Sequence, residues 1–144
     1  MSARGFAVAR RHEREALATA ISRHAPRGAV RVAEALAATA LNRRRRAERL
    51  WSGVFAGEAP AFDAIFAALP EQPIGARSSA RADAAWRAIC RRIAARALAG
   101  AAAGAGSDPA GGAHYVTPLG APPPAEATLV TAYVGPFAFH RARG

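Results

Sequence analysis

The chain has 144 residues, enough for one compact domain that buries a hydrophobic core. Its formal net charge is +10 and all 20 basic residues are Arg, so the molecule attracts polyanions such as nucleic acid, anionic membranes and acidic cell-wall polymers. Cys90 is the only cysteine, which excludes an internal disulfide and a metal site built from several cysteines. We find neither the apolar segment of a secretory signal nor an uninterrupted apolar run of about 18 residues, so we expect no membrane span.

The chain divides into a basic N-terminal segment, residues 1–12, and a single domain, residues 13–144. We expect the N-terminal segment to be poorly ordered. The first helix of the domain is predicted to begin near residue 13 and to end at His24. Leu17, Ile21 and His24 recur at helical spacing, which places His24 on the inward face of that helix.

A tight corner is predicted directly after His24. Pro26 stops the helix, because its ring clashes with the preceding turn and it offers no N–H group, and Gly28 permits a sharp change of direction. A second helix is predicted over residues 29–49, with Glu34 as the one carboxylate in its small, apolar first half. A polar side chain at the inner end of one helix, facing a helix of small residues, is a place where a functional site can form.

The predicted second helix ends in a run of arginines, Arg43 to Arg46 and Arg49. Cations at this end of a helix interact favourably with its dipole, so the run is typical of a solvated helix end. It also fits a patch that binds a polyanion, and the sequence leaves both readings open. The residues expected to anchor the core after this helix are Trp51, Val54, Phe55, Phe62, Ile65 and Phe66.

A third helix is the clearest prediction in the chain. Ser78 and Ser79, or Asp83, can cap its start, and Gly100 is expected to end it. One apolar stripe and one basic face follow from helical spacing: the stripe is Trp86, Cys90, Ile93 and Ala97, and the arginines facing away are Arg87, Arg91, Arg92 and Arg96. Cys90 is therefore interpreted as a small buried hydrophobe and not as a nucleophile.

The C-terminal part is rich in Gly and Pro. Residues 128–134 are β-prone, and residues 137–140 alternate aromatic and other side chains, so we expect short strands or extended loops laid over the helices. A loop carrying His114 and Tyr115 can wall a cleft, or it can simply cover the core. The predicted fold class is mainly α, and α+β at most.

Generic catalytic motifs are missing from the sequence. It contains no phosphate-binding GxxxxGK[ST] loop, no HExxH pair and no GxSxG elbow. The four histidines, His12, His24, His114 and His140, are too scattered to indicate a metal site. No cofactor is implied.

Five segments of the chain nevertheless resemble, in the right order, motifs of the cell wall hydrolase family of the SleB type, which includes spore-cortex-lytic enzymes. The resemblance covers about residues 17–141. The five segments are Leu17 to Arg43 ending in LNR, Pro70 to Pro73 (PEQP), Ile93 to Gly100 (IAARALAG), Asp108 to Tyr115 (DPAGGAHY) with Pro118 after it, and Val134 to His140 (VGPFAFH).

The resemblance implies a small, lysozyme-like helical domain that cleaves the glycan strand of peptidoglycan. The catalytic group of the family is a single Glu, which protonates the departing glycosidic oxygen. The products form by attack of water or, in a lytic transglycosylase, of the sugar's own 6-hydroxyl.

The chain departs from the family at that position, because His24 stands where the resemblance places the Glu. Pro73 replaces the Phe of the P-x-Q-F motif, and Pro136-Phe137 replaces an Asn-His pair. An imidazolium can donate a proton, but burial in an apolar cleft disfavours the charged ring. Glu34 is a weaker candidate for the acid, because pairing with Arg31 or another arginine explains it better.

Several other residues are candidates for sugar binding. Gln72 retains the family residue and can hydrogen-bond a sugar, and Tyr115, next to His114, can stack on a sugar ring or fill the core. Asn42 can contact substrate, although satisfying backbone groups near the helix end explains it better. Asp108 is expected to cap the Gly-rich turn, since Asp-Pro initiates turns.

Three functions are consistent with these observations. The first is a peptidoglycan hydrolase, impaired by the exchange at His24. The second is a non-catalytic protein that binds the cell wall or forms part of a phage-like particle. The third, a nucleic-acid binder, fits the charge but has no recognition motif. For the first two we expect synthesis in the cytoplasm and action at the cell wall or periplasm after delivery by a route other than a signal peptide.

Overall fold

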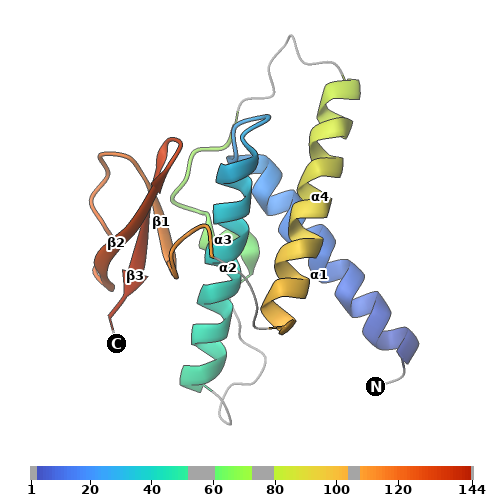
Figure 1. The fold of residues 1–144 in the computed structure, drawn as a ribbon, viewed down its shortest axis with the longest axis horizontal. Coiled ribbons are helices and arrows are strands. Elements are labelled where there is room, and N and C mark those ends of the chain that lie inside the picture. The colour runs from blue at the N-terminus through green and yellow to red at the C-terminus, as the bar shows by residue number, and fades with distance from the viewer. Residues whose placement is uncertain (1–2, 52–60, 73–79, 104–107, 144) are drawn as a thin grey trace.

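The computed structural model describes residues 3–51, 61–72, 80–103 and 108–143. Four helices come first, α1 (Ala3–His24), α2 (Val30–Trp51), α3 (Phe62–Ile65) and α4 (Ala80–Ala103). Three strands follow, β1 (Tyr115–Pro118), β2 (Ala127–Val134) and β3 (Phe137–Ala142). Figure 1 shows the helices packed together and the sheet beside them, next to α2. The fold is therefore helix-rich with a small antiparallel sheet, as the sequence predicts.

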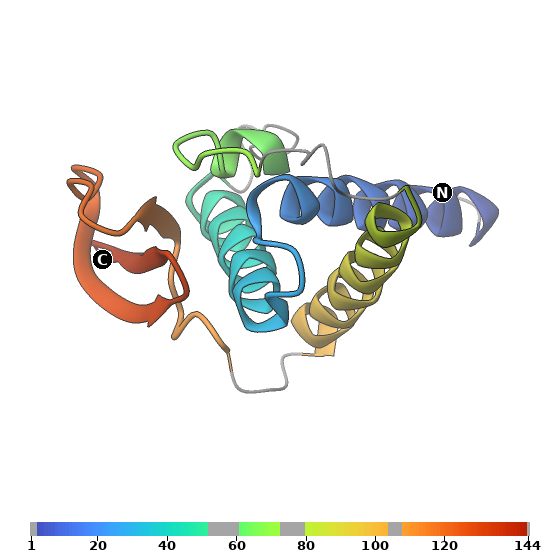
Figure 2. The same cartoon turned by 90° about the horizontal axis from the view of Figure 1, so that it is seen from above.

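Helix α1 starts at Ala3, so the prediction of a poorly ordered segment over residues 1–12 is wrong for residues 3–12. Alanine and arginine make up most of residues 3–12, and both have high intrinsic helix propensity. The helix therefore continues outward from its packed half. Its first turns extend past the other helices in both Figure 1 and Figure 2.

Helix α2 is the central element of the molecule. It lies between α1 and α4 on one side and the sheet on the other (Figure 2). Small side chains let the other helices approach closely: Ala33, Ala37 and Ala40 are fully buried, with Leu36 between them. Thr39 is also fully buried, and its hydroxyl donates to the carbonyl of Ala35 at 2.8 Å, which satisfies the one polar group on this face.

Helix α4 follows the predicted apolar stripe. Trp86, Cys90 and Ile93 are buried, Ala97 packs partly buried against the core, and the four predicted outward arginines are exposed. The expected C-terminal cap at Gly100 is wrong, because the helix continues to Ala103 and Gly100 has no positive φ. The alanines that follow Gly100 favour continuation of the helix.

The short helix α3 completes the helical layer. Phe62, Ile65 and Phe66 are buried as predicted, and Leu69 joins them. The predicted core anchors Val54 and Phe55 lie outside the described residues, as does the side chain of Trp51, and the same holds for the capping candidates Ser78 and Ser79.

The sheet has the strand order β1-β3-β2, and both strand pairs are antiparallel. Its inner face contributes Val116, Phe137 and Phe139 to the core. A two-residue turn at Gly135-Pro136 connects β2 and β3, and Gly135 adopts φ +57°, a conformation that glycine tolerates best. The C-terminal segment thus forms strands over the helices, one of the two arrangements that its composition predicts.

Candidate functional site

The corner after α1 places His24. The N–H of Ala25 donates to the carbonyl of Ile21 at 2.9 Å, which closes the last helical turn, and Gly28 then adopts φ +83°. The N–H of Ala29 donates to the carbonyl of Pro26 at 2.9 Å. The predicted corner is confirmed, and His24, 5% exposed, is the last residue of the helix and faces inward.

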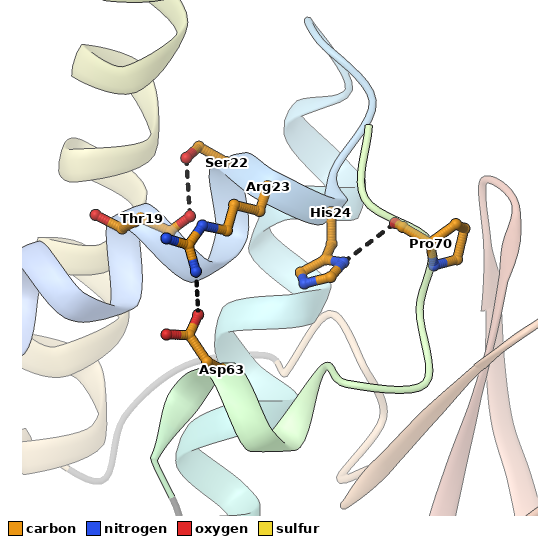
Figure 3. Close-up of polar contacts among 6 residues, drawn as sticks. All are labelled: Thr19, Ser22, Arg23, His24, Asp63 and Pro70. Atoms are coloured by element: carbon orange, nitrogen blue, oxygen red, sulfur yellow. Dashed lines mark hydrogen bonds and ion pairs between the residues drawn. The ribbon is translucent and has the colours of Figure 1, made fainter. Parts of the chain in front are cut away.

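The imidazole of His24 is held by two contacts, of which Figure 3 draws the one to Pro70. Its Nδ1 lies 3.1 Å from the carbonyl oxygen of Pro70, and because a carbonyl can only accept, Nδ1 is the donor. Its ring centroid is 5.8 Å from that of Phe66, with the planes tilted by 60°. No carboxylate within the described ranges hydrogen-bonds to this ring. The nearby Asp63 is instead bound by Arg23 at 3.1 Å.

Gln72 joins the same helix end. Its backbone N–H donates to the carbonyl of Arg23 at 2.7 Å, and its side-chain Nε2 donates to the carbonyl of His24 at 3.2 Å. The last carbonyls of a helix have no partner within the helix, and Gln72 satisfies two of them. The structure therefore brings together His24 and Gln72, which are 48 residues apart. The Gln72 side-chain amide is used in a hydrogen bond that stabilises the fold.

Glu34 lies away from these residues, exposed on α2. The expected ion pair with Arg31 or another arginine is wrong, because Glu34 forms no ion pair with any residue that the structure describes. Arg31 precedes Glu34 by three residues, which is the less favourable order for a helical pair, and an exposed pair contributes little.

Asn42 and Asp108 form a second cluster at the Gly-rich turn. Asp108 accepts from the N–H of Ala110 at 2.8 Å and from that of Gly112 at 3.0 Å, so it caps the turn as predicted. The side-chain amide of Asn42 donates to Asp108 Oδ2 at 2.7 Å and to the carbonyl of Ala113 at 3.1 Å. Asn42 thus links α2 to the Gly-rich turn. The sequence predicted instead that its side chain would satisfy backbone groups near the end of its own helix.

His114 and Tyr115 follow this turn and differ in environment. His114 is buried, and its Nδ1 accepts from the N–H of Ala142 at 3.1 Å. Tyr115 is half-buried, and the guanidinium carbon of Arg43 lies 4.6 Å from its ring centroid. One face of the Tyr115 ring is therefore covered by a cation, which uses the same π-surface that a sugar would stack on.

Some contacts could not be expected from spacing in the sequence. Arg27 in the corner pairs with Asp83 in the first turn of α4, a residue that the sequence suggests only as a cap. His140 hydrogen-bonds the hydroxyl of Thr117 across two strands at 2.8 Å. Burial lowers the pKa of His140 from its ordinary value. Each pair joins residues that only the tertiary fold makes neighbours.

The described residues contain no group of three His, Cys, Asp or Glu side chains that could hold a metal ion. Among the described helices, none combines the length and the hydrophobicity needed to cross a membrane. Comparison of the chain with protein-family models, curated proteins and solved structures yields no match. The resemblance to cell wall hydrolases therefore stays a prediction from the sequence motifs.

Proposed function

We propose that this chain is a divergent, lysozyme-like cell wall hydrolase domain that binds the glycan strand of peptidoglycan and has lost most of the family's acid catalysis. The observation that carries the proposal is the meeting of the motif segments in space. The segment containing Gln72 binds the end of α1 at His24, and the segment containing Asp108 binds Asn42 of the LNR motif. Motifs recognised separately along the chain thus pair with one another through specific hydrogen bonds.

The loss of acid catalysis follows from the surroundings of His24. An acid that cleaves a glycosidic bond must reach the leaving oxygen and must carry a proton near neutral pH. The Nδ1–H of His24 is engaged by the carbonyl of Pro70, so it is not free for a leaving oxygen. No carboxylate of the described residues hydrogen-bonds to the ring, so no acidic side chain at this position takes over the role of the family Glu.

The exchange of His24 for Glu tests this proposal directly. A carboxyl group at this position, packed against Phe66, would have its pKa raised by burial and would hold a proton for the glycosidic oxygen. In zymograms with purified sacculi, we expect His24→Glu to clear at least about tenfold faster than the wild type. His24→Gln is the matched control, because it is similar in size and polar but cannot act as an acid, and it should not gain activity.

Binding provides the second arm of the test. Wild type and His24→Gln should both sediment with sacculi, since the proposal separates glycan binding from cleavage. If the wild type stays in the supernatant at low salt and the folded His24→Glu variant clears nothing between pH 4 and 8, the proposal fails. If the wild type clears as fast as His24→Glu does, the claimed loss of catalysis is wrong.

A further inference from the structure

Helix α4 presents arginines on its solvent side without compensating acids. Arg87, Arg92 and Arg96 are exposed, and within the described part of the chain they form no ion pair or hydrogen bond. Arg91, between them, is bonded to Glu15 at 3.1 Å. The sequence has no carboxylate between Asp83 and Asp108. Three unpaired guanidinium groups therefore lie within about 14 Å along the helix axis. By helical spacing, Arg92 and Arg96 border the exposed face of α4 on one edge and Arg87 borders it on the other.

The arginine run on α2, the most basic stretch in the sequence, is arranged differently. Arg44 pairs with Glu13 at 2.6 Å, Arg43 lies over Tyr115, and Arg46 donates to the carbonyl of Arg143 at 2.7 Å. Arg45 also has a partner. These contacts hold α2 to other parts of the molecule, so the guanidinium groups on α4 are more available to an external anion.

The surface around the α4 arginines indicates which kind of anion fits. Every exposed residue between Ala80 and Gly100 is either alanine or arginine. The face thus lacks aromatic rings on which bases stack and amide side chains that read base edges. It also lacks the large apolar side chains that insert into a lipid surface. A linear polymer of fixed negative charges, contacted through those charges alone, matches such a face.

We propose that the exposed face of α4, carrying Arg87, Arg92 and Arg96, binds a phosphodiester polymer of the cell wall. The choice of a wall polymer rests on the proposed function, whereas the complementarity of charge is independent of it. Figures 1 and 2 show α4 on the far side of α2 from the sheet. The polymer would therefore be held on a different side of the molecule from the strands, while the glycan strand is contacted near His24.

Co-sedimentation with sacculi tests the proposal. One sample of sacculi keeps its phosphodiester polymer, and the other has been treated with hydrofluoric acid, which cleaves phosphodiesters. The triple variant Arg87→Gln, Arg92→Gln and Arg96→Gln should bind the untreated sacculi about tenfold more weakly than the wild type at low salt. The matched control, Arg31→Gln, Arg45→Gln and Arg46→Gln on α2, removes the same charge and should bind within about twofold of the wild type. Thermal melting followed by circular dichroism verifies that both variants are folded.

The outcomes separate this inference from the proposed function. An equal loss in both variants would mean that net charge alone drives binding, and it would overturn the assignment to α4. So would tighter binding of the wild type to duplex DNA than to the wall polymer at the same phosphate concentration. Binding to the treated sacculi with no effect of the α4 variant would leave the proposed function intact and reject this inference. Binding to untreated sacculi alone, lost in the α4 variant, would support this inference and reject glycan recognition.

Discussion

The buried histidines are each satisfied by a specific neighbour. His24 donates to the Pro70 carbonyl, His114 accepts from the Ala142 N–H, and His140 bonds the Thr117 hydroxyl. A buried polar group without a partner destabilises a protein by about 1–3 kcal/mol. These hydrogen bonds remove that cost for the three buried imidazoles. Histidine in this chain therefore stabilises the junctions between segments, at the corner and within the sheet.

The buried site of His140 makes stability depend on pH. Because burial lowers its pKa in the folded state, the unfolded chain binds more protons than the folded chain below about pH 6.5. The free energy of unfolding should therefore fall as the pH is lowered from 6.5 through the pKa of the folded state. The contribution of one proton cannot exceed about 1.4 kcal/mol per pH unit.

Urea titrations between pH 7.5 and 5 measure this effect in the wild type and in His140→Gln. The variant lacks the titrating ring, so its free energy of unfolding should change less steeply with pH, whatever its absolute stability. Equal slopes in the two proteins would show that His140 does not contribute to the pH dependence.

At the scale of elements, the turn between β2 and β3 is fitted closely to helix α2. A Cβ atom built on Gly135 would lie 2.5 Å from Cγ2 of Val32, well inside van der Waals contact, and Gly135 has φ +57°. Gly120 has φ +84° but open space around it. The two glycines thus share a conformational requirement, and only Gly135 also has a packing requirement.

Substituting alanine for each glycine separates the conformational requirement from the packing requirement. Gly120→Ala should lower the free energy of unfolding by about 1 kcal/mol through strain at positive φ. Gly135→Ala should lower it by about 1–3 kcal/mol more, because the added methyl group forces the hairpin away from Val32. Equal losses in chemical denaturation would show that the hairpin is not packed on α2 in this way.

At the scale of the whole molecule, α4 closes the core around one thiol. Cys90 is fully buried in the same hydrophobic cluster as Leu17 of α1 and Leu36 of α2. Burial raises the pKa of this thiol to about 11, so almost no thiolate exists at neutral pH. Cys90 becomes accessible to solvent, and its thiol can ionise readily, only when α4 separates from the other helices.

Alkylation of Cys90 should therefore report global unfolding. At pH 7.5 the native protein should react with a small maleimide at least about a thousandfold more slowly than the protein in concentrated urea. The denaturant dependence of the labelling rate should match that of unfolding measured by circular dichroism. Rapid labelling in native buffer, with unchanged helical content, would contradict the packing of α4.

The prediction of the helices depended on patterns that are local in the sequence. The apolar stripe of α4, the corner at Pro26 and Gly28, and the buried face around Phe66 follow from spacing and from the conformational preferences of single residues. The errors occur where several continuations are locally acceptable. Residues 3–12 and the chain beyond Gly100 both extend a helix because their neighbours favour it, and no local signal requires an end there.

The candidate site was less predictable, since its contacts join residues far apart in the chain. The sequence marks His24, Gln72, Asn42 and Asp108 as residues of interest, but the hydrogen bonds that pair them depend on the docking of whole segments. The same limit applies to the arginines. Their number gives the charge of the molecule, whereas the presence of a carboxylate, a carbonyl or a ring beside each one is set by packing.

The sequence by itself determined the helical character, the strong positive charge, the corner at Pro26 and Gly28 and the presence of an imidazole at the inner end of the first helix. These follow from residue type and from spacing within one element. Only the tertiary structure decided that His24 is buried on Phe66 and bonded to Pro70. It also decided that Arg87, Arg92 and Arg96 of α4 have no partner among the described residues, whereas Arg43 to Arg46 of α2 do. The physical reason is that burial and pairing depend on which surfaces meet, and those surfaces come from segments that are distant in the chain.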